Sequence, residues 1–292
     1  MVDQGGRELA IEDTKPDTVV SLQGASLGFG DRMLWDGLDL QIRAGEFFAV
    51  LGPNGSGKTS FLKVLLGLQP LRAGTVMVGG EAARRGSRHI GYVPQQKSFA
   101  RDTPLRARDL VGLGLDGHRW GLRIRGREHR RRVDELLAKV GATDYAQVPV
   151  GLLSGGEQQR LRVAQALATD PEVLLCDEAL LSLDLNHQKA VSKLVSDQCK
   201  DNQSAVVFVT HEINPIIEHV DRVLYLAGGR FRVGTPEEVM TTEVLSELYG
   251  THVEVLQANG RIVVVGLPDA TTHDHADHEA NHLHANQLME GF

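Results

Sequence analysis

Apolar and polar positions divide the chain into short strand-like and helix-like segments. Residues 1–18 are polar and show no periodicity, which predicts a disordered N-terminal tail. From Val19 the pattern alternates as in β-strands, and the continuous apolar run 47–52 predicts a buried strand. Residues 58–68 then place apolar side chains at helical spacing. The chain therefore enters its first large unit with strands followed by a helix.

Two later apolar runs, 173–178 and 205–212, end in polar residues. Parallel strands that are buried on both faces have this pattern, with functional groups at their C-terminal ends. The intervening region, about 97–170, is mainly helical in pattern. We expect these segments to form one domain over 19–240, with a helical subdomain at about 97–170.

The C-terminal part differs in pattern from the rest. Residues 241–267 predict a small helix and a β-hairpin, because Asn259 and Gly260 separate two β-rich runs. Residues 268–292 are poor in apolar side chains and rich in histidine, which predicts a disordered tail.

Composition limits the class of protein. The 292 residues carry 31 basic and 38 acidic side chains, a net charge of −7, which gives no support for a nucleic-acid-binding surface over the whole chain. No apolar run approaches a membrane span, and the N-terminus lacks the pattern of a signal peptide. With only Cys176 and Cys199, a disulfide framework is excluded and a reducing cytoplasm is expected. The 32 glycines indicate many tight turns or close backbone approaches.

A phosphate-binding loop follows the first buried strand. The motif G-x-x-x-x-G-K-[ST] is matched by Gly52, Pro53, Asn54, Gly55, Ser56, Gly57, Lys58 and Thr59, with Ser60 next in the following helix. Glycine amides and the helix N-terminus favour phosphate oxygens, Lys58 would reach the β- and γ-phosphates, and Thr59 would bind Mg²⁺. The alternative is a glycine-rich turn with an incidental lysine, which the flanking strand and helix disfavour.

The acidic pair Asp177 and Glu178 ends the second buried run. A carboxylate at this place holds the metal in nucleotide hydrolases, so Asp177 is the predicted Mg²⁺ partner. Glu178 is suited to orient and polarise an attacking water. Two surface acids at a strand end are the alternative.

A second anion site is predicted at the N-terminus of another helix. Its residues are Ser154, Gly155, Gly156 and Gln158, within the segment LSGGEQ. With small residues at this helix N-terminus, the backbone amides and the Ser154 hydroxyl are expected to face a phosphate. Because the chain already has one phosphate loop, this second site suggests that two chains share each nucleotide.

LSGGEQ ahead of VLLCDE resembles the signature of ABC-type ATPases, and the resemblance covers about 19–240. It implies an α/β P-loop NTPase fold of ABC type, with a mixed sheet core, an antiparallel β subdomain and a helical subdomain. It also implies ATP and Mg²⁺ as cofactors. Gln95 would sense the metal and γ-phosphate, and His211 would contact the γ-phosphate and steady Glu178 and its water. Catalysis is thus expected from Glu178, His211, Lys58 and Gln95.

Further positions follow from the same resemblance. Phe29 would stack on adenine, with a core phenylalanine as the alternative, and Asp184 lies in the loop that crosses to the opposite subunit. One departure is Ala179, where the family usually has proline directly after the catalytic glutamate. That change loosens a turn but removes no catalytic group, so ATP hydrolysis is still expected.

The expected role is the energising subunit of a transporter. The resemblance implies a homodimer on a separate membrane permease, peripheral on the cytoplasmic face of the plasma membrane, with an extracytoplasmic metal-binding protein in the same system. The segment from His211 to Leu256 is similar to the zinc/manganese importer branch. The alternatives are an importer of another small solute, such as an iron chelate or haem, and a soluble ABC ATPase acting on nucleic acid or ribosomes.

Two charged segments have open interpretations. The C-terminal tail combines carboxylates with His273, His275, His278, His282 and His284, a set of ligands that suits Zn²⁺. It is interpreted either as a weak metal site or as a solvated tail without function. The arginine-rich stretch between Arg119 and Arg132 is interpreted either as a solvated face or as a contact with anionic lipid headgroups.

Overall fold

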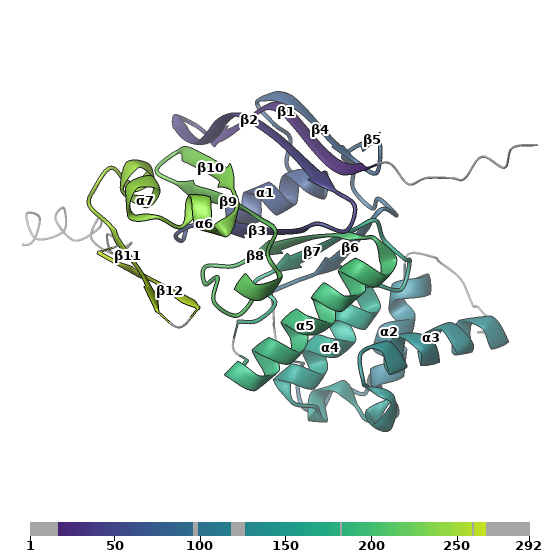
Figure 1. Cartoon of the computed structure of the whole chain (residues 1–292). Helices are drawn as coiled ribbons and strands as arrows, with labels where there is room; N and C mark the ends of the chain where they lie inside the picture. Colours follow the sequence, from purple (N-terminus) through teal and green to yellow (C-terminus); the bar gives the residue numbers. More distant parts are fainter. Residues whose placement is uncertain (1–16, 96–98, 118–125, 182, 259, 267–292) are drawn as a thin grey trace, which may run out of the picture.

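A computed structural model describes residues 17–95, 99–117, 126–181, 183–258 and 260–266. A central sheet has the strand order β10-β9-β3-β8-β7-β6 (Figure 1). The strands that run parallel in it are β3 (Phe47–Leu51), β6 (Ile90–Val93), β7 (Val173–Asp177), β8 (Ala205–Val209) and β9 (Arg222–Ala227). Strand β10 (Arg230–Gly234) pairs antiparallel with β9 at the edge.

The central sheet is buried on both faces. Phe47, Ala49 and Leu51 of β3 face one hydrophobic core, whereas Phe48 and Val50 face the other. Strands β7 and β8 are also buried at every position. This double burial is why these runs have no polar alternation in the sequence.

A second sheet covers one face of the central sheet, with the order β2-β1-β4-β5. Its strands are antiparallel: β1 (Thr18–Phe29), β2 (Arg32–Arg43), β4 (Ala73–Val78) and β5 (Glu81–Ala82). Helix α1 (Lys58–Leu65) packs into the core between the sheets (Figure 1). There Phe61 meets Trp35 edge to face, with 6.1 Å between the ring centroids. The helix is shorter than the predicted 58–68, since Gly67 takes a φ of 65° just beyond its end.

Helices cover the other face (Figure 1). They are α2 (Ala107–Asp116), α3 (Arg127–Lys139), α4 (Gly155–Ala166) and α5 (Leu185–Asn202), with 3-10 turns η1 (Thr143–Tyr145), η2 (Val150–Leu152) and η3 (Ile217–His219). The first three of these helices fall within the predicted helical region. None of the helices in the described ranges is long and apolar enough to cross a membrane.

The C-terminal part contains α6 (Pro236–Val239), α7 (Thr242–Tyr249) and a hairpin of β11 (Glu254–Ala258) and β12 (Arg261–Val265). The pair Ala258 and Arg261 flanks the turn, where the sequence predicted it. A hydrogen bond of 2.9 Å between the hydroxyls of Tyr225 and Tyr249 ties α7 to β9. Of the predicted tails, residues 1–16 of the first and all of the second, 268–292, lie outside the described residues, as do the arginines at 119, 123 and 125. Thr18, which was predicted to belong to the N-terminal tail, begins β1.

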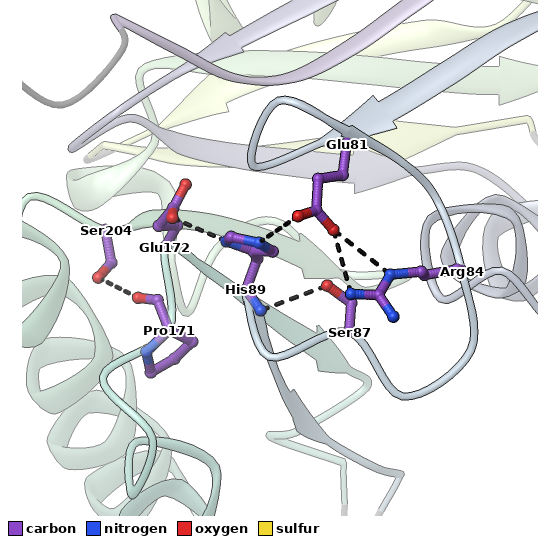
Figure 2. Close-up of polar contacts among 7 residues, drawn as sticks. All are labelled: Glu81, Arg84, Ser87, His89, Pro171, Glu172 and Ser204. Atoms are coloured by element: carbon purple, nitrogen blue, oxygen red, sulfur yellow. Dashed lines mark hydrogen bonds and ion pairs between the residues drawn. The ribbon is translucent and has the colours of Figure 1, made fainter.

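A polar cluster joins the two sheets at the N-terminal ends of β6 and β7 (Figure 2). The His89 ring lies between Glu172, at 2.8 Å from Nδ1 to Oε1, and Glu81, at 3.8 Å from Nε2 to Oε1. The ring also packs against Gly79, where an added Cβ would lie 2.5 Å from it. His89 thus connects β5 of one sheet with β6 and β7 of the other.

Candidate active site

The C-terminal ends of β3, β6, β7 and β8 meet at one edge of the central sheet because these strands are parallel. Each end carries polar residues from a different part of the sequence. The 52–59 loop follows β3, Gln95 follows β6, Asp177 and Glu178 end β7, and His211 follows β8. The fold therefore brings these predicted segments to one place.

The loop at 52–59 has the backbone that its glycines allow. Gly52 has a φ of 142°, and a Cβ there would lie 2.1 Å from the carbonyl oxygen of Leu226. Gly57 has a φ of 107°, and its Cβ would lie 2.8 Å from the Trp35 ring. The loop lies directly on β9 and on the second sheet, and because of this close approach and the positive φ angles both positions need glycine.

Lys58 lies buried inside this loop. Its ammonium group donates to the carbonyl oxygens of Gly52 (2.7 Å) and Pro53 (3.0 Å). Burial lowers the pKa of Lys58, and the charges of Glu178 and Asp177 act in the opposite direction. A cation held by carbonyls at the N-terminus of α1 is placed to receive phosphate oxygens. The Ser56 hydroxyl in the same loop is buried and has no hydrogen-bond partner among the described residues.

The end of β7 presents its two carboxylates differently. Asp177 is 7% exposed and accepts a hydrogen bond from the Tyr92 hydroxyl at 3.3 Å. Desolvation raises the pKa of Asp177. Glu178 has a φ of 45°, rare for a residue other than glycine, and its N–H donates to Val209 at 2.9 Å. Such strain is typical of functional positions that the surrounding structure holds in place.

Gln95 and His211 lie on either side of the Glu178 carboxylate. Gln95 Nε2 donates to Glu178 Oε2 at 3.0 Å, and His211 Nδ1 lies 3.7 Å from Glu178 Oε1. A cavity of about 410 Å³ opens here, and its lining comprises Asn54, Thr59, Gln95, Glu178, Leu181 and His211. Hydroxyl, amide and carboxylate oxygens are ligands that Mg²⁺ prefers. Thr59 and Gln95 line this cavity and fit that ion chemically, as does the carboxylate of Asp177, which lies at the end of β7 outside the lining.

A second cavity, of about 310 Å³, adjoins the phosphate loop. Its lining comprises Phe29, Arg32, Leu34, Asn54, Gly55, Gly57, Lys58, Thr59, Ser60 and Glu178. Phe29 is 51% exposed, which removes the alternative of a core phenylalanine and leaves its ring free to stack on a ligand. The cavity is therefore lined both by an aromatic ring, on which a base could stack, and by the loop that is predicted to bind phosphates.

Ser154 begins α4 with a capping box. Its hydroxyl accepts from the Glu157 N–H (3.4 Å), and its own N–H donates to the Glu157 carboxylate (2.8 Å). Of the described residues, none from 154–158 lines either cavity at the phosphate loop. Gln158 faces inward: it is 4% exposed and donates to Val150 and Leu153, both at 3.0 Å. Within one chain, this segment is separate from the phosphate loop.

Asp184 and His187 connect α5 with this segment. Asp184 caps α5 by accepting from the N–H groups of Asn186 and His187, both at 3.0 Å. The bond from the His187 N–H, together with a contact of 2.7 Å between His187 Nδ1 and Asp184 Oδ2, lowers the pKa of Asp184. The His187 ring lies on Gly156, where an added Cβ would be 2.2 Å from it. Gly156 therefore allows α5 to approach the predicted anion site closely.

The sequence-based prediction omitted two residues of the site. Arg32 lines the cavity that contains Phe29 and donates to the Gly55 carbonyl at 2.9 Å. Arg32 pairs with Phe29 across the turn between β1 and β2. Its position three residues after the predicted adenine contact is therefore the sequence signal that would have identified Arg32. Tyr92, the second residue, bonds to Asp177, which depends on the pairing of β6 with β7 and has no local signal.

Comparison with known proteins is consistent with this geometry. The model of the ABC transporter family matches residues 35–181. The manganese transport system ATP-binding protein MntB of Halalkalibacterium halodurans is 29% identical, over 85% of this chain and 99% of that protein. The zinc import ATP-binding protein ZnuC of Paramagnetospirillum magneticum is 33% identical over 81% and 84%. The cobalamin import ATP-binding protein BtuD of Halobacterium salinarum is 34% identical over 83% and 62%.

Two solved structures are also similar. A chain of a transporter described as of metal-chelate type, in an inward-facing conformation, superposes with a TM-score of 0.72 and 26% identity, covering 85% of this chain and 96% of that one. A dimeric ATP-binding cassette in a post-hydrolysis state, bound to ADP and Pi, has a TM-score of 0.61 and 28% identity, covering 74% and 98%.

Proposed function

The chain belongs to the ABC transporter ATP-binding family and is an ATPase, and from this premise we propose that it energises an importer of Zn²⁺ or Mn²⁺. The observation that supports hydrolysis by this chain is the grouping of Lys58, Gln95, Glu178 and His211 at one edge of the sheet.

The proposed reaction is transfer of the γ-phosphoryl group of ATP to water. Adenine stacks on Phe29, and the phosphates lie in the 52–59 loop where Lys58 stabilises the charge on the β- and γ-phosphates. Thr59, Gln95 and Asp177 would hold Mg²⁺, which when bound would neutralise charge on the phosphate oxygens. Glu178 orients the attacking water, and His211 contacts the γ-phosphate and steadies the Glu178 carboxylate. Positioning and charge stabilisation lower the barrier, with no covalent intermediate.

The second phosphate contact is proposed to come from another copy of the chain. Ser154, Gly155 and Gly156 of one subunit close on the nucleotide held by the other, and Asp184 lies in the crossing loop. The side chain of Gln158, which was predicted to join them, instead turns inward and bonds to the carbonyl groups of Val150 and Leu153. The separation of 154–158 from the phosphate loop within one chain supports this arrangement. In a homodimer with two-fold symmetry, the same pair of surfaces then forms both sites.

A separate permease completes the proposed transporter. The chain would lie peripherally on the cytoplasmic face of the plasma membrane, and an extracytoplasmic binding protein would deliver the metal. A manganese and a zinc system among the relatives support the choice of metal. The relatives also include import proteins for cobalamin and iron(3+)-hydroxamate. They support a second candidate function, the import of an iron chelate or another small solute. The acidic net charge of −7 disfavours action on nucleic acid or ribosomes.

The test replaces Glu178 by Gln, which keeps the shape of the side chain and removes its charge. Turnover should fall by about 10²–10⁴-fold, since a positioned base contributes that much, and ATP should hold the variant as a dimer in size-exclusion chromatography. Glu172→Gln, at the opposite end of β7, is the matched control and should turn over normally. Normal turnover by Glu178→Gln would remove Glu178 from its role.

The carried metal is tested in cells in which Glu178→Gln is the only form of the protein. Cellular zinc or manganese should fall relative to the unmodified strain, while iron stays constant. A fall in iron alone would instead support the iron-chelate candidate. Co-purification with RNA rather than with an integral membrane protein would contradict a role in transport.

A further inference from the structure

The loop that carries His211 is attached to the C-terminal hairpin through the side chain of Asn214. Asn214 Nδ2 donates to the carbonyl oxygen of Ile262 at 2.9 Å, and the Ile262 N–H donates to Asn214 Oδ1 at 2.8 Å. Ile262 lies opposite Gln257 in the hairpin, so its two polar backbone groups point off the free edge of β12. Asn214 satisfies both groups at a residue that is 8% exposed.

The other end of the loop is also held. The Thr210 N–H donates to Val50 in β3 at 3.2 Å, and the Thr210 hydroxyl bonds to both the N–H and the carbonyl of Glu212, each at 3.1 Å. His211 therefore lies between two fixed points, Thr210 on the central sheet and Asn214 on the hairpin. Its own side chain is 49% exposed, so packing does not fix the ring.

The hairpin is anchored well enough to act as a support. The Val255 N–H donates to the Thr242 hydroxyl at 2.9 Å, and the Ser246 hydroxyl bonds to both polar backbone groups of Val253 at 3.0–3.1 Å. Helix α7 is in turn tied to β9 through the two tyrosine hydroxyls. These contacts link β12 to the same sheet that carries the phosphate loop.

A cavity of about 370 Å³ lies beside the His211 loop. Its lining includes Leu51, His211, Asn214 and Tyr225 together with residues of β12. The loop is thus not packed solidly against the sheet on this side. Without the Asn214 contact, the loop has space to shift, and a shift of about 1 Å in a catalytic group is enough to slow a reaction about a hundredfold.

We propose that Asn214 is a positioning residue, through which the C-terminal hairpin holds His211 against Glu178. The inference rests on the proposed role of His211 in hydrolysis. It assigns a function to the hairpin, which would set the rate of ATP hydrolysis without touching the nucleotide.

The test measures steady-state ATP hydrolysis by the full-length chain carrying Asn214→Ala. We expect kcat to fall about tenfold with KM for ATP unchanged, because Asn214 lines neither cavity at the phosphate loop. Asn214→Asp keeps the acceptor for the Ile262 N–H and loses the donor, so its loss in kcat should be smaller. Leu256→Thr, on the exposed face of the same hairpin, is the matched control and should match the unmodified chain.

A double-mutant cycle with His211→Ala separates positioning from a general loss of structure. Single-turnover measurements should show that Asn214→Ala causes no further loss when His211 is absent, since its effect acts through that ring. Independent, additive losses would overturn the inference. If thermal unfolding shows that Asn214→Ala does not fold, Asn214→Asp takes its place in the cycle.

Two outcomes separate this inference from the proposal beneath it. Full turnover by Asn214→Ala, with His211→Ala impaired, would refute the positioning role and leave His211 in place. Full turnover by His211→Ala would instead refute the proposed role of His211 itself.

Discussion

Glu178 combines a strained backbone with two side-chain contacts. Its φ of 45° turns the residue out of the β conformation directly at the end of β7. Gln95 and His211 then meet its carboxylate from the ends of β6 and β8. Ala179, which follows where the family usually has proline, is fully buried and packs in the core. The turn therefore forms without proline, because the neighbouring strands and the core hold it.

Lys58 gives a direct test of the phosphate loop. Replacing Lys58 by Ala should weaken ATP binding by about two orders of magnitude, since hydrogen bonds to charged groups contribute about 1.5–3 kcal/mol each. Titration with a fluorescent ATP analogue measures the change. Lys63→Ala removes an exposed lysine from the same helix and should bind ATP normally. Tight binding by Lys58→Ala would contradict the assignment of the loop.

Strand β6 links two distant parts of the molecule. Its N-terminal end follows His89, which joins the two sheets (Figure 2). Its C-terminal end leads to Gln95 beside Glu178. The His89 side chain is 11% exposed and lies against Glu172 in the loop before β7. The cluster is thus a structural contact at the edge of the sheet opposite the active site.

Replacing His89 by Ala should therefore reduce stability and leave catalysis intact. The free energy of unfolding should fall by about 1–3 kcal/mol, because the partly buried Glu172 loses its partner. Denaturant unfolding measures this loss, and kcat for the folded protein should stay unchanged. Arg84→Ala removes an exposed contact of Glu81 and should barely shift the unfolding midpoint. A loss of kcat at unchanged stability would show that His89 acts on the active site.

At the scale of the whole molecule, the 52–59 loop and the proposed second phosphate contact at 154–158 lie apart within one chain. This separation predicts that Ser154 acts only between subunits. In the Glu178→Gln background, Ser154→Arg should abolish the ATP-dependent dimer, because a long charged side chain blocks closure on the partner's nucleotide. ATP should still bind to the monomer.

Light scattering and nucleotide titration measure the two properties separately. Thr169→Arg, exposed beyond the C-terminal end of α4, is the control and should still dimerise with ATP. Loss of ATP binding by Ser154→Arg would instead place Ser154 at the nucleotide of its own chain.

The histidine-rich tail gives a second prediction at this scale. Deleting 268–292 should leave ATP hydrolysis unchanged and lower the affinity of the purified protein for Zn²⁺, because imidazole and carboxylate groups suit that ion. Isothermal titration calorimetry measures the affinity. A full-length variant with His273, His275, His278, His282 and His284 all replaced by Gln should behave like the deletion. Unchanged zinc binding in both would leave the tail as a solvated segment without function.

Much of the local structure of the candidate site is determined by the sequence alone, because its signals are local. The glycines of 52–59 permit backbone angles that other residues disfavour, and Asn259-Gly260 favours a hairpin turn whatever surrounds it. The apolar runs that end in Asp177 and before His211 predicted buried parallel strands in the same way. Each of these signals lies within a few residues of the feature that it predicts.

Tertiary structure alone decided which distant segments meet. The insertion of β8 between β3 and β7 places His211 beside Glu178, and the pairing of β6 with β7 brings Tyr92 to Asp177. The inward turn of Gln158 and the bond between Asn214 and β12 likewise join residues that the local pattern leaves unconnected. Strand order and such contacts arise from the packing of whole elements around two shared cores. The local pattern of a short segment does not specify the distant segment against which it packs, so these contacts could not be predicted from it.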